Sequence, residues 1–286
     1  MNQRRFQFGE NWQAFLKQVD QERIQQACLS LRSILSLDPE ADQPLAGRSF
    51  LDIGSGSGLF SLAALLLGAE RVVSLDYDRD SVDCGVQLQT SLAAEQPQLA
   101  QRWQIMQGSV LDAEQMQSLG QFEIVYSWGV LHHTGDMAQA IMNAANCVNE
   151  GGTFSLAIYN DQGGASGRWL RIKRIYNRLP KMLRGGWVLA IASCYELKFA
   201  AARLAKGQNP LPFKDWAAKK QDRGMSAWHD WVDWVGGLPF EVAKPEEIIM
   251  PLHEQGFHLT FLQTQTAGWG CNEFTFAKRL QPSNPE

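Results

Sequence analysis

The chain has 286 residues, of which 45% are hydrophobic and 20% charged, and its formal net charge is −4. This length suits one large domain, or one domain with a sizeable insertion, and the composition is typical of a soluble protein with a buried core. No apolar run approaches the ~20 residues of a membrane span, and the opening MNQRRFQFGE lacks the apolar stretch of a secretory signal. The five cysteines are odd in number, far apart and without a CxxC pair, which predicts reduced thiols in a cytoplasmic protein and no zinc site.

Positive charge is concentrated in one segment of the chain. Residues 156–215 hold 11 Lys/Arg and 3 Asp/Glu, a balance of +8. The other residues therefore hold 15 Lys/Arg (26 minus 11) and 27 Asp/Glu (30 minus 3), a balance of −12. An acidic body thus carries one basic segment.

The N-terminal residues are expected to be helical. Apolar residues recur at helical spacing from Trp12 to Leu35, with a break near Asp20, which predicts two helices. The following segment 38–47, DPEADQPLAG, has the composition of a turn-rich linker.

Strand and helix signals then alternate along the chain. This alternation implies βαβ units and a mostly parallel sheet. After a long interruption the pattern resumes with a helix and two strands, so the interruption is expected to be a cap inserted before a final hairpin. The predicted strands are 49–53, 71–75, 103–107, 122–127, 153–159, 257–265 and 273–278, and the predicted helices of this part are 59–67, 80–95, 136–148 and 245–255.

The segment LDIGSGSGLFSLAALLLG at 51–68 predicts a strand end, a glycine-rich turn and a helix, an arrangement that many proteins use to bind a nucleotide. A dinucleotide fingerprint reads GxGxxG, but Leu59 stands where its third glycine would fall. Asp52, directly before the turn, would repel a phosphate and attract an ammonium group. S-adenosylmethionine has an amino-acid end, a sulfonium and no phosphate, so it fits this charge pattern, and an NAD-dependent oxidoreductase is disfavoured.

A second acid stands at the end of the second predicted strand. Asp76 follows Gly54 by 22 residues, where a carboxylate can accept both hydroxyls of a ribose. Tyr77 is expected to pack on the adenine. Asp78 is the weaker candidate, because it lies further past the strand.

These motifs together resemble the class I S-adenosylmethionine-dependent methyltransferases over about 45–160 and 245–280. DIGSGSG resembles the family's glycine motif and LDYD its acidic motif. QGSVLD at 107–112 resembles the adenine-binding segment, and VYSWGVLHHT at 125–134 the fourth motif of small-molecule methyltransferases, including those of quinone biosynthesis. The resemblance implies an α/β, Rossmann-like, doubly wound sheet of seven strands, with N-terminal helices and a helical cap between strands five and six.

The family resemblance also implies a domain organisation. Residues 1–44 would form an N-terminal helical lid, 45–160 the S-adenosylmethionine-binding core, 161–243 a helical cap for the substrate, and 244–286 the helix and hairpin that complete the core. N-terminal helices close over the methionine end of the cofactor in related enzymes, and simple packing of this helix on the sheet is the alternative.

One position departs from the family pattern. An acid often follows the glycine after strand three, but this chain has Ser109 there, so the adenine amino group would be held by Asp112 or by backbone and water. The residues expected to bind the cofactor are Asn11, Trp12, Asp52, Gly54, Ser55, Gly56, Gly58, Asp76, Tyr77, Ser109, Val110, Ser127 and Trp128.

The candidate bases follow strand four. In a methyl transfer the acceptor lies in line with the sulfur–methyl bond at about 3–3.5 Å, and a hydroxyl acceptor benefits from a base. His132 and His133 are candidates, because histidine titrates near ~6.5. Since consecutive residues point in different directions, at most one is expected to face the acceptor, and His132 is favoured; alternatively both brace the loop. Tyr159 either lines the pocket or packs at the end of strand five.

The interruption before the final hairpin contains two helical patterns. SGRWLRIKRIYNRLPKMLR has seven Lys/Arg and no acid, and predicts a basic amphipathic helix up to Pro180. It could meet an anionic lipid surface, a phosphate-bearing substrate, RNA or the acidic body of the protein. Further on, Trp228, Trp231 and Trp234 recur every three residues, either joining the cap to the body or lining an acceptor pocket, and His229 is a candidate to orient or deprotonate the acceptor.

The leading hypothesis is an enzyme that methylates O or N of a small-molecule acceptor and releases S-adenosylhomocysteine, without a metal. The basic cap makes an anionic or lipid-like acceptor one option. An RNA methyltransferase is the first alternative, but no RNA-binding module is recognisable, and SWGV replaces the Pro-Pro-Tyr motif of exocyclic-amine methylation, so nucleic acid is not the expected partner. A non-catalytic, S-adenosylmethionine-binding regulatory protein is the second.

Overall fold

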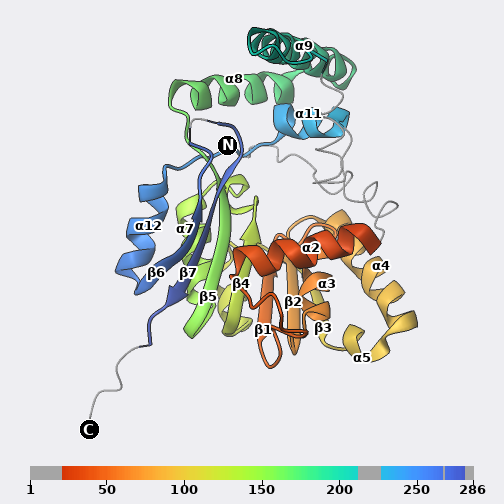
Figure 1. Cartoon of the computed structure of the whole chain (residues 1–286), viewed down its shortest axis with the longest axis vertical. Coiled ribbons are helices and arrows are strands. Elements are labelled where there is room, and N and C mark those ends of the chain that lie inside the picture. The colour runs from red at the N-terminus through yellow and green to blue at the C-terminus, as the bar shows by residue number, and fades with distance from the viewer. Residues whose placement is uncertain (1–20, 212–226, 267, 281–286) are drawn as a thin grey trace. The chain divides into compact units, whose positions relative to one another are not determined.

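The computed structural model describes residues 21–211, 227–266 and 268–280, with Ala227, His229, Asp230 and Asp233 described as backbone only (Figure 1). The chain divides into two compact units. Of the described residues, the core unit comprises 21–162 and 240–280, and the insertion unit comprises those between 163 and 239. The helix expected before Asp20 lies outside the described residues.

The core unit is built on one sheet of seven strands in the order β3-β2-β1-β4-β5-β7-β6. The first five strands pair in parallel, and β7 pairs antiparallel with both β5 and β6. The strand order reverses between β1 and β4, which is where open α/β sheets bind ligands beyond the carboxyl ends of their strands. The strands are β1 Ser49–Ile53, β2 Arg71–Asp76, β3 Trp103–Gln107, β4 Phe122–Trp128, β5 Val148–Tyr159, β6 Phe257–Gln263 and β7 Cys271–Lys278.

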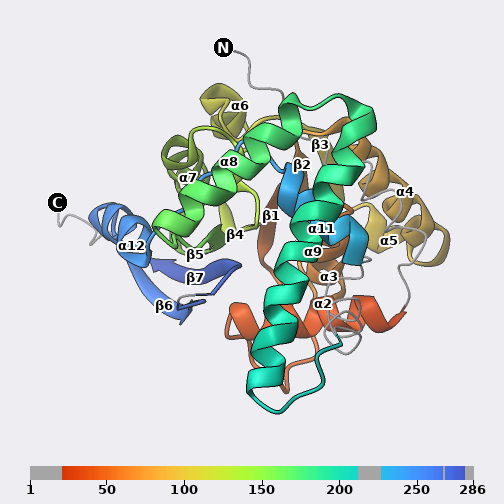
Figure 2. The same ribbon diagram turned by 90° about the horizontal axis from the view of Figure 1, so that it is seen from above.

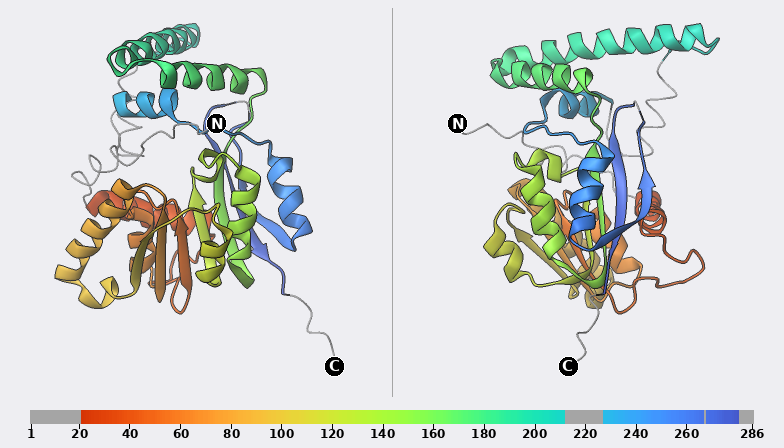
Figure 3. Two further views of the ribbon diagram at one scale, coloured as in Figure 1. Left: turned by 180° about the vertical axis from the view of Figure 1, so that it is seen from behind. Right: turned by 90° about the vertical axis from the view of Figure 1, so that its left-hand side faces the viewer.

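Helices cover both faces of this sheet (Figure 3). The central strands are buried in continuous runs because a parallel sheet between two helical layers is covered on both faces. One face packs on α2 Gln21–Ile34, α3 Leu59–Leu66, α4 Arg79–Glu95 and α5 Pro97–Ala100. The other packs on α6 Ala113–Ser118, α7 Met137–Asn146 and α12 Pro245–Glu254. The predicted doubly wound, seven-stranded α/β fold is therefore confirmed.

Strand β5 differs from the sequence prediction. The strand, predicted to begin at residue 153, begins at Val148 and so includes the Gly151-Gly152 pair. The pairing with β4 shifts there, from Phe122 opposite Val148 to Ile124 opposite Thr153. A Cβ on Gly152 would lie 2.8 Å from the Asn149 carbonyl oxygen, so this irregular stretch admits no side chain. The glycines signal a bulge, which a single sequence does not distinguish from a turn.

The insertion unit contains three described helices, α8 Gly164–Arg178, α9 Lys181–Ala205 and α11 Ala227–Gly236. The predicted basic helix is α8, and it ends before Pro180 as expected. The long helix α9 was not predicted, because its apolar residues point to both sides of the helix and give no single stripe. Figure 2 shows α8 and α9 in front of α11.

Aromatic residues join the three helices of the insertion unit. Trp169 of α8 stacks on Tyr195 of α9 with ring centroids 4.9 Å apart, and meets Trp234 of α11 edge-on at 5.5 Å. Trp231 of α11 lies 6.2 Å from Tyr195. Two tryptophans of the predicted triplet therefore build the core of this unit, and a role in an acceptor pocket stays a prediction.

A buried cation also holds the insertion unit together. Lys173 of α8 is fully buried, and its ammonium group donates to the carbonyl of Trp234 near the end of α11. Asn177, one turn further on, donates to the Gly236 carbonyl at 2.8 Å. Both side chains satisfy carbonyls that have no partner within α11, where a positive charge also complements the helix dipole. Lys173 is therefore removed from the basic surface that the sequence predicts.

Within residues 21–211, 227–266 and 268–280, no helix is both long and apolar enough to cross a bilayer. The five cysteines are all free thiols.

Candidate active site

The glycine-rich turn joins β1 to α3. Gly54, Gly56 and Gly58 adopt φ angles of 75°, 55° and 80°, in the left-handed region that side chains rarely adopt. A Cβ on Gly54 would overlap the side chain of Val130, and one on Gly58 would lie 2.9 Å from the ring of Trp103. The turn is thus closely packed, and its partly exposed residues are Gly54 and Ser55.

Asp76, at the end of β2, is hydrogen-bonded to this turn. One carboxylate oxygen accepts the Gly56 amide at 2.8 Å, and the other accepts the Asp78 amide at 2.9 Å. The Tyr77 amide also acts on this carboxylate, and because the two oxygens together offer about four acceptor positions, acceptor capacity remains for a ligand hydroxyl. Burial raises the pKa of Asp76 to about 6 even though these amides favour the ionised form. Asp76 is therefore placed, as the sequence predicts, beside the turn.

Asp52, at the end of β1, is buried behind the turn. Its carboxylate accepts the Ser61 hydroxyl at 2.6 Å. The Ser61 oxygen lies 2.6 Å from that of Ser74, which accepts the indole N–H of Trp103 at 2.7 Å. An indole nitrogen only donates, so with Asp52 ionised each hydroxyl proton in this chain points towards Asp52. The sequence analysis missed Ser61, Ser74 and Trp103, although the two serines stand out within the apolar segments LFSLAALLL and RVVSLD.

The electrostatics of Asp52 are those of a buried charge. Its pKa is raised to about 7, mainly by burial and also by the nearby Asp76 carboxylate. The hydrogen bond from Ser61 acts in the opposite direction. A cationic ligand group near these two carboxylates would relieve the repulsion and favour their ionised forms. An anionic phosphate would worsen it.

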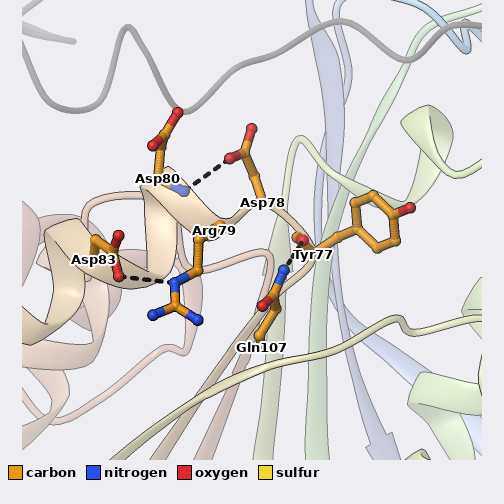
Figure 4. A network of polar contacts seen from close by, with 6 residues as sticks. All are labelled: Tyr77, Asp78, Arg79, Asp80, Asp83 and Gln107. Atoms are coloured by element: carbon orange, nitrogen blue, oxygen red, sulfur yellow. Dashed lines mark hydrogen bonds and ion pairs between the residues drawn. The ribbon is translucent and has the colours of Figure 1, made fainter.

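Tyr77 and Asp78 follow Asp76 into α4. Asp78 caps this helix, because its carboxylate accepts the Asp80 amide at 2.9 Å. The ring of Tyr77 is exposed, and Figure 4 shows it pointing away from Asp78 and Asp80. Gln107 of β3 donates to the Tyr77 carbonyl at 3.2 Å. Asp78 therefore has a structural role, while the Tyr77 ring is accessible for packing on a ligand.

The segment after β3 is held by its own hydrogen bonds. The Ser109 hydroxyl accepts the Leu111 amide at 3.2 Å, and Asp112 caps α6 by accepting the Gln115 amide at 3.0 Å. Val110 is buried, and its carbonyl accepts the Asn143 side-chain amide at 2.8 Å. Contact of this segment with an adenine stays a prediction.

Two further predicted cofactor residues join strands. The buried Ser127 hydroxyl donates to the Ile53 carbonyl at 2.9 Å, which fixes β4 beside the start of the glycine turn. The Trp128 indole donates to the Glu273 carboxylate at 3.2 Å. Both side chains thus position the strand ends, and direct contact with a cofactor stays a prediction.

The candidate bases form an aromatic cluster beyond β4 and β5. The ring of His132 lies 4.4 Å from that of His133 and 3.9 Å from that of Tyr159, between centroids. His133 meets Tyr159 edge-on at 5.3 Å, and Phe240 lies 5.6 Å from Tyr159. His132 is fully buried, whereas His133 and Tyr159 are partly exposed.

The two histidines share an aromatic neighbour but differ in exposure, and the expectation that at most one faces the acceptor stays a prediction. They lie in a 3-10 turn, η1 Leu131–His133, and not in extended chain, so both rings reach Tyr159. The accessible ring belongs to His133, while the favoured residue, His132, is enclosed. The ring of His132 packs on Tyr159, which in turn contacts Phe240, a residue more than 100 positions further along the chain than His132.

Glu241 holds this turn in place. Its amide donates to the His132 carbonyl at 3.0 Å, and its carboxylate accepts the amides of Gly135 and Met137, both at the start of α7. Burial raises the pKa of Glu241. No motif singled out Glu241, because its partners lie about a hundred residues away.

Three predicted site residues are not placed. Asn11 and Trp12 lie outside the described residues, and the side chain of His229 in α11 is outside the described part as well. Among the residues that the structure describes, no group of three or more His, Cys, Asp or Glu side chains is arranged to hold a metal ion.

A seven-stranded sheet of this order, with a glycine turn and two carboxylates at its switch point, defines the class I methyltransferase fold. Comparison with known sequences agrees. Residues 51–154 match the family described as "Methyltransferase domain". The resemblance read from the sequence motifs is therefore confirmed over residues 51–154.

A solved structure of similar fold is magnesium protoporphyrin IX methyltransferase from Synechocystis PCC 6803, determined with bound S-adenosylhomocysteine. The similarity covers 94% of this chain and 93% of that one, with a TM-score of 0.52 and 16% sequence identity. The two folds are thus similar over nearly the whole length of both chains. That structure contains S-adenosylhomocysteine, the product of S-adenosylmethionine, which is consistent with the predicted cofactor.

Curated relatives match over shorter stretches. A ribosomal protein L11 methyltransferase from Sorangium cellulosum is 53% identical over 47 residues, which is 16% of this chain and 14% of that protein. A second, from Alteromonas mediterranea, is 28% identical over 141 residues, or 45% of each chain. The alignments thus span less than half the length of these relatives, so they support the domain and leave the acceptor open.

Proposed function

We propose that this chain is an S-adenosylmethionine-dependent methyltransferase that transfers a methyl group to an oxygen or nitrogen of a small-molecule acceptor. The observation that carries the proposal is the pair of carboxylates on either side of the glycine turn, the buried Asp52 and the partly buried Asp76. Both pKa values are raised by burial, so the site gains most from a ligand that brings positive charge and hydroxyl donors.

The residues around the turn fit the parts of this cofactor. Asp52 would attract the ammonium group of its amino-acid end, and the free acceptor positions of Asp76 would bind the ribose hydroxyls. The exposed ring of Tyr77 would pack on the adenine. Val130 and Trp103 occupy the space that side chains on Gly54 and Gly58 would need. Because the glycines of the turn have no side chains, a ligand would approach its backbone closely.

When bound, the cofactor supplies a methyl group on a sulfonium that is already a good leaving group. The protein then needs to orient the acceptor, exclude water and, for a hydroxyl, take its proton. Burial favours His133 over His132 for this last role, because His133 is partly exposed and is oriented by Tyr159. His132 would brace the turn through its ring contacts and through the Glu241 amide on its carbonyl.

A labelling experiment tests the proposed activity. The purified protein is given methyl-labelled S-adenosylmethionine with an extract of its source cells, and the products are separated by size and solubility. Label in a low-mass or lipid fraction supports a small-molecule acceptor. Label confined to RNA or protein would contradict it, and S-adenosylhomocysteine binding without any transfer would favour a regulatory protein.

The histidine assignment is tested once an acceptor is known. His133→Gln is expected to lower kcat about 10²-fold or more and to flatten the rise of the rate between pH 6 and 8, because it removes the base. His132→Gln is the matched control, and it should lower the stability more than it alters the pH profile. An unchanged rate in His133→Gln would exclude it as the base.

A further inference from the structure

Helix α9 presents a row of exposed apolar side chains. Met182 and Leu197 are 93% and 71% exposed, while Val188 and Ala192, on the other side of the helix, are buried. Positions 182, 189, 197 and 204 follow each other at seven or eight residues, which is two helical turns, so they share one side of the helix. The members of this outer α9 row are Met182, Leu183, Leu189, Leu197 and Leu204.

The outer α9 row is long and contains no charge. Small residues, Gly186, Ala190 and Ser193, occupy the positions between its leucines. A helix of 25 residues extends about 37 Å at 1.5 Å per residue. Exposed apolar surface of this extent is uncommon on a protein that meets only water, and it marks an interaction site.

Exposed cations accompany this row. Arg168, Arg171, Arg174 and Arg178 recur every three or four residues on the exposed side of α8. Lys181, Lys198 and Lys206 are exposed as well, which makes seven exposed cations between residues 164 and 206. The only acid in that segment is Glu196, which lies 3.9 Å from Arg203. The segment therefore exposes positive charge that no acid within it neutralises.

Both sets of residues lie on the same side of the insertion unit. Helix α11 packs against α8 through Trp234, which meets Trp169, and against α9 through Trp231, which meets Tyr195. The exposed residues of α8 and α9 therefore face away from α11. Figure 2 shows the ribbons of α8 and α9 in front of that of α11.

This combination selects among the candidate partners. A second copy of the chain docked on the same face would bring seven exposed cations against seven, which is unfavourable for an isologous interface. RNA would use the arginines, but its bases stack on aromatic side chains, and the exposed row is aliphatic. An anionic bilayer surface offers phosphates for the arginines and an apolar layer for the leucines.

We propose that the outer α9 row and the exposed arginines of α8 form a peripheral binding surface for anionic lipid bilayers. The leucines enter the boundary between headgroups and acyl chains, and the arginines bind headgroup phosphates. The protein lies on the bilayer and does not span it. This inference is independent of the proposed methyl transfer, and its readout is binding alone.

Vesicle co-sedimentation of the full chain tests the proposal. Vesicles of 70% phosphatidylcholine and 30% phosphatidylglycerol are compared with pure phosphatidylcholine vesicles at ~0.1 M salt, where charges still act over about 10 Å. Binding to the anionic vesicles is expected to be at least about tenfold tighter, and to weaken as salt is raised. Equal binding to both vesicles, or none, overturns the proposal.

Two double variants separate the apolar and the charged contribution. Leu189→Glu with Leu197→Glu should weaken binding to anionic vesicles at least about tenfold, because the row no longer inserts. Arg171→Gln with Arg174→Gln should weaken binding to anionic vesicles and leave the weak binding to phosphatidylcholine unchanged. The matched control is Leu29→Glu with Met250→Glu, two exposed apolar residues of α2 and α12, which should bind as the unchanged chain does.

The same variants identify the competing occupants. All the altered side chains are exposed, so each variant is expected to fold, and circular dichroism checks this. A homodimer seen by sedimentation that Leu189→Glu with Leu197→Glu abolishes would overturn the proposal in favour of self-association. RNA binding that the arginine variant loses and the leucine variant retains, without vesicle binding, would overturn it in favour of RNA.

Discussion

The core unit and the insertion unit each bury a charge, and they treat it differently. In the insertion unit, the ammonium group of Lys173 is bound to the carbonyl of Trp234 at the end of α11, where a cation is needed. In the core unit, Asp52 accepts a hydroxyl from Ser61, yet burial still raises its pKa to about 7. The buried ammonium group is compensated by a helix end and stabilises the fold. The buried carboxylate still disfavours its ionised form, so a cationic ligand would gain from binding beside it.

The largest effect is expected where the charge is structural. Lys173→Ala removes the hydrogen bond to the Trp234 carbonyl and leaves a cavity, so we expect it to lower the free energy of unfolding by roughly 2–4 kcal/mol. Urea unfolding followed by circular dichroism measures this loss. Arg171→Ala, exposed on the same helix, is the control and should change stability by less than about 0.5 kcal/mol. Equal losses in the two variants would show that Lys173 has no such role.

On the ligand side, Asp76→Ala should weaken S-adenosylhomocysteine binding by roughly 1–3 kcal/mol, through loss of the hydrogen bonds to the ribose. Titration calorimetry above pH 7 measures it, where Asp76 is ionised. Asp78→Asn is the matched control, because it keeps the cap of α4 and lies two residues away. Unchanged affinity in Asp76→Ala would remove the ribose assignment.

The two units also differ in how much of their structure the sequence predicts. The glycine turn and Asp76 were predictable because sterics and strand order fix them locally, within one βαβ unit. The bulge of β5 was not, since glycines permit a turn or a bulge and only the pairing of Ile124 with Thr153 decides. Helix α9 was missed because apolar residues on both of its sides hide the usual stripe.

The candidate base shows a different limit. The motif VYSWGVLHHT locates both histidines correctly after β4, but it does not say which one is enclosed. The ring of His132 packs on Tyr159 of β5, and Phe240, from the segment after the insertion, packs on Tyr159 in turn. Lys173 is a similar case, because its sequence pattern is that of a surface cation and its partner is a carbonyl 61 residues away.

Asp52→Asn distinguishes ligand binding from stability. The pKa of Asp52 in the folded protein, about 7, lies above the usual 3.8, so the stability of the ligand-free fold falls as pH rises from about 4 to about 7. The neutral variant should be more stable at pH 8 by roughly 1–3 kcal/mol, and the gain should shrink as pH falls from 7 towards 4. Thermal unfolding at pH 8 and 4.5 measures this, while S-adenosylhomocysteine affinity should fall. A variant that is less stable at pH 8 would contradict the sign.

The smallest effect is expected at the far end of the hydrogen-bond chain that leads to Asp52. Trp103→Phe keeps an aromatic ring against Gly58 but removes the N–H that donates to Ser74. Ser74 and Ser61 can still donate towards Asp52, yet less firmly, so S-adenosylhomocysteine affinity at pH 7.5 should fall by only about 0.5–1 kcal/mol. The informative readout is the pH at which affinity is half lost on acidification, because Asp52 must be ionised to attract the ammonium group. This midpoint should move upward in Trp103→Phe, since weaker donation to the carboxylate favours its protonated form. Besides these hydrogen bonds, the negative charge of Asp76 also acts on Asp52, and the substitution leaves Asp76 in place. An affinity loss with no shift of the midpoint would mean that Trp103 acts through packing on the glycine turn and not through the charge of Asp52.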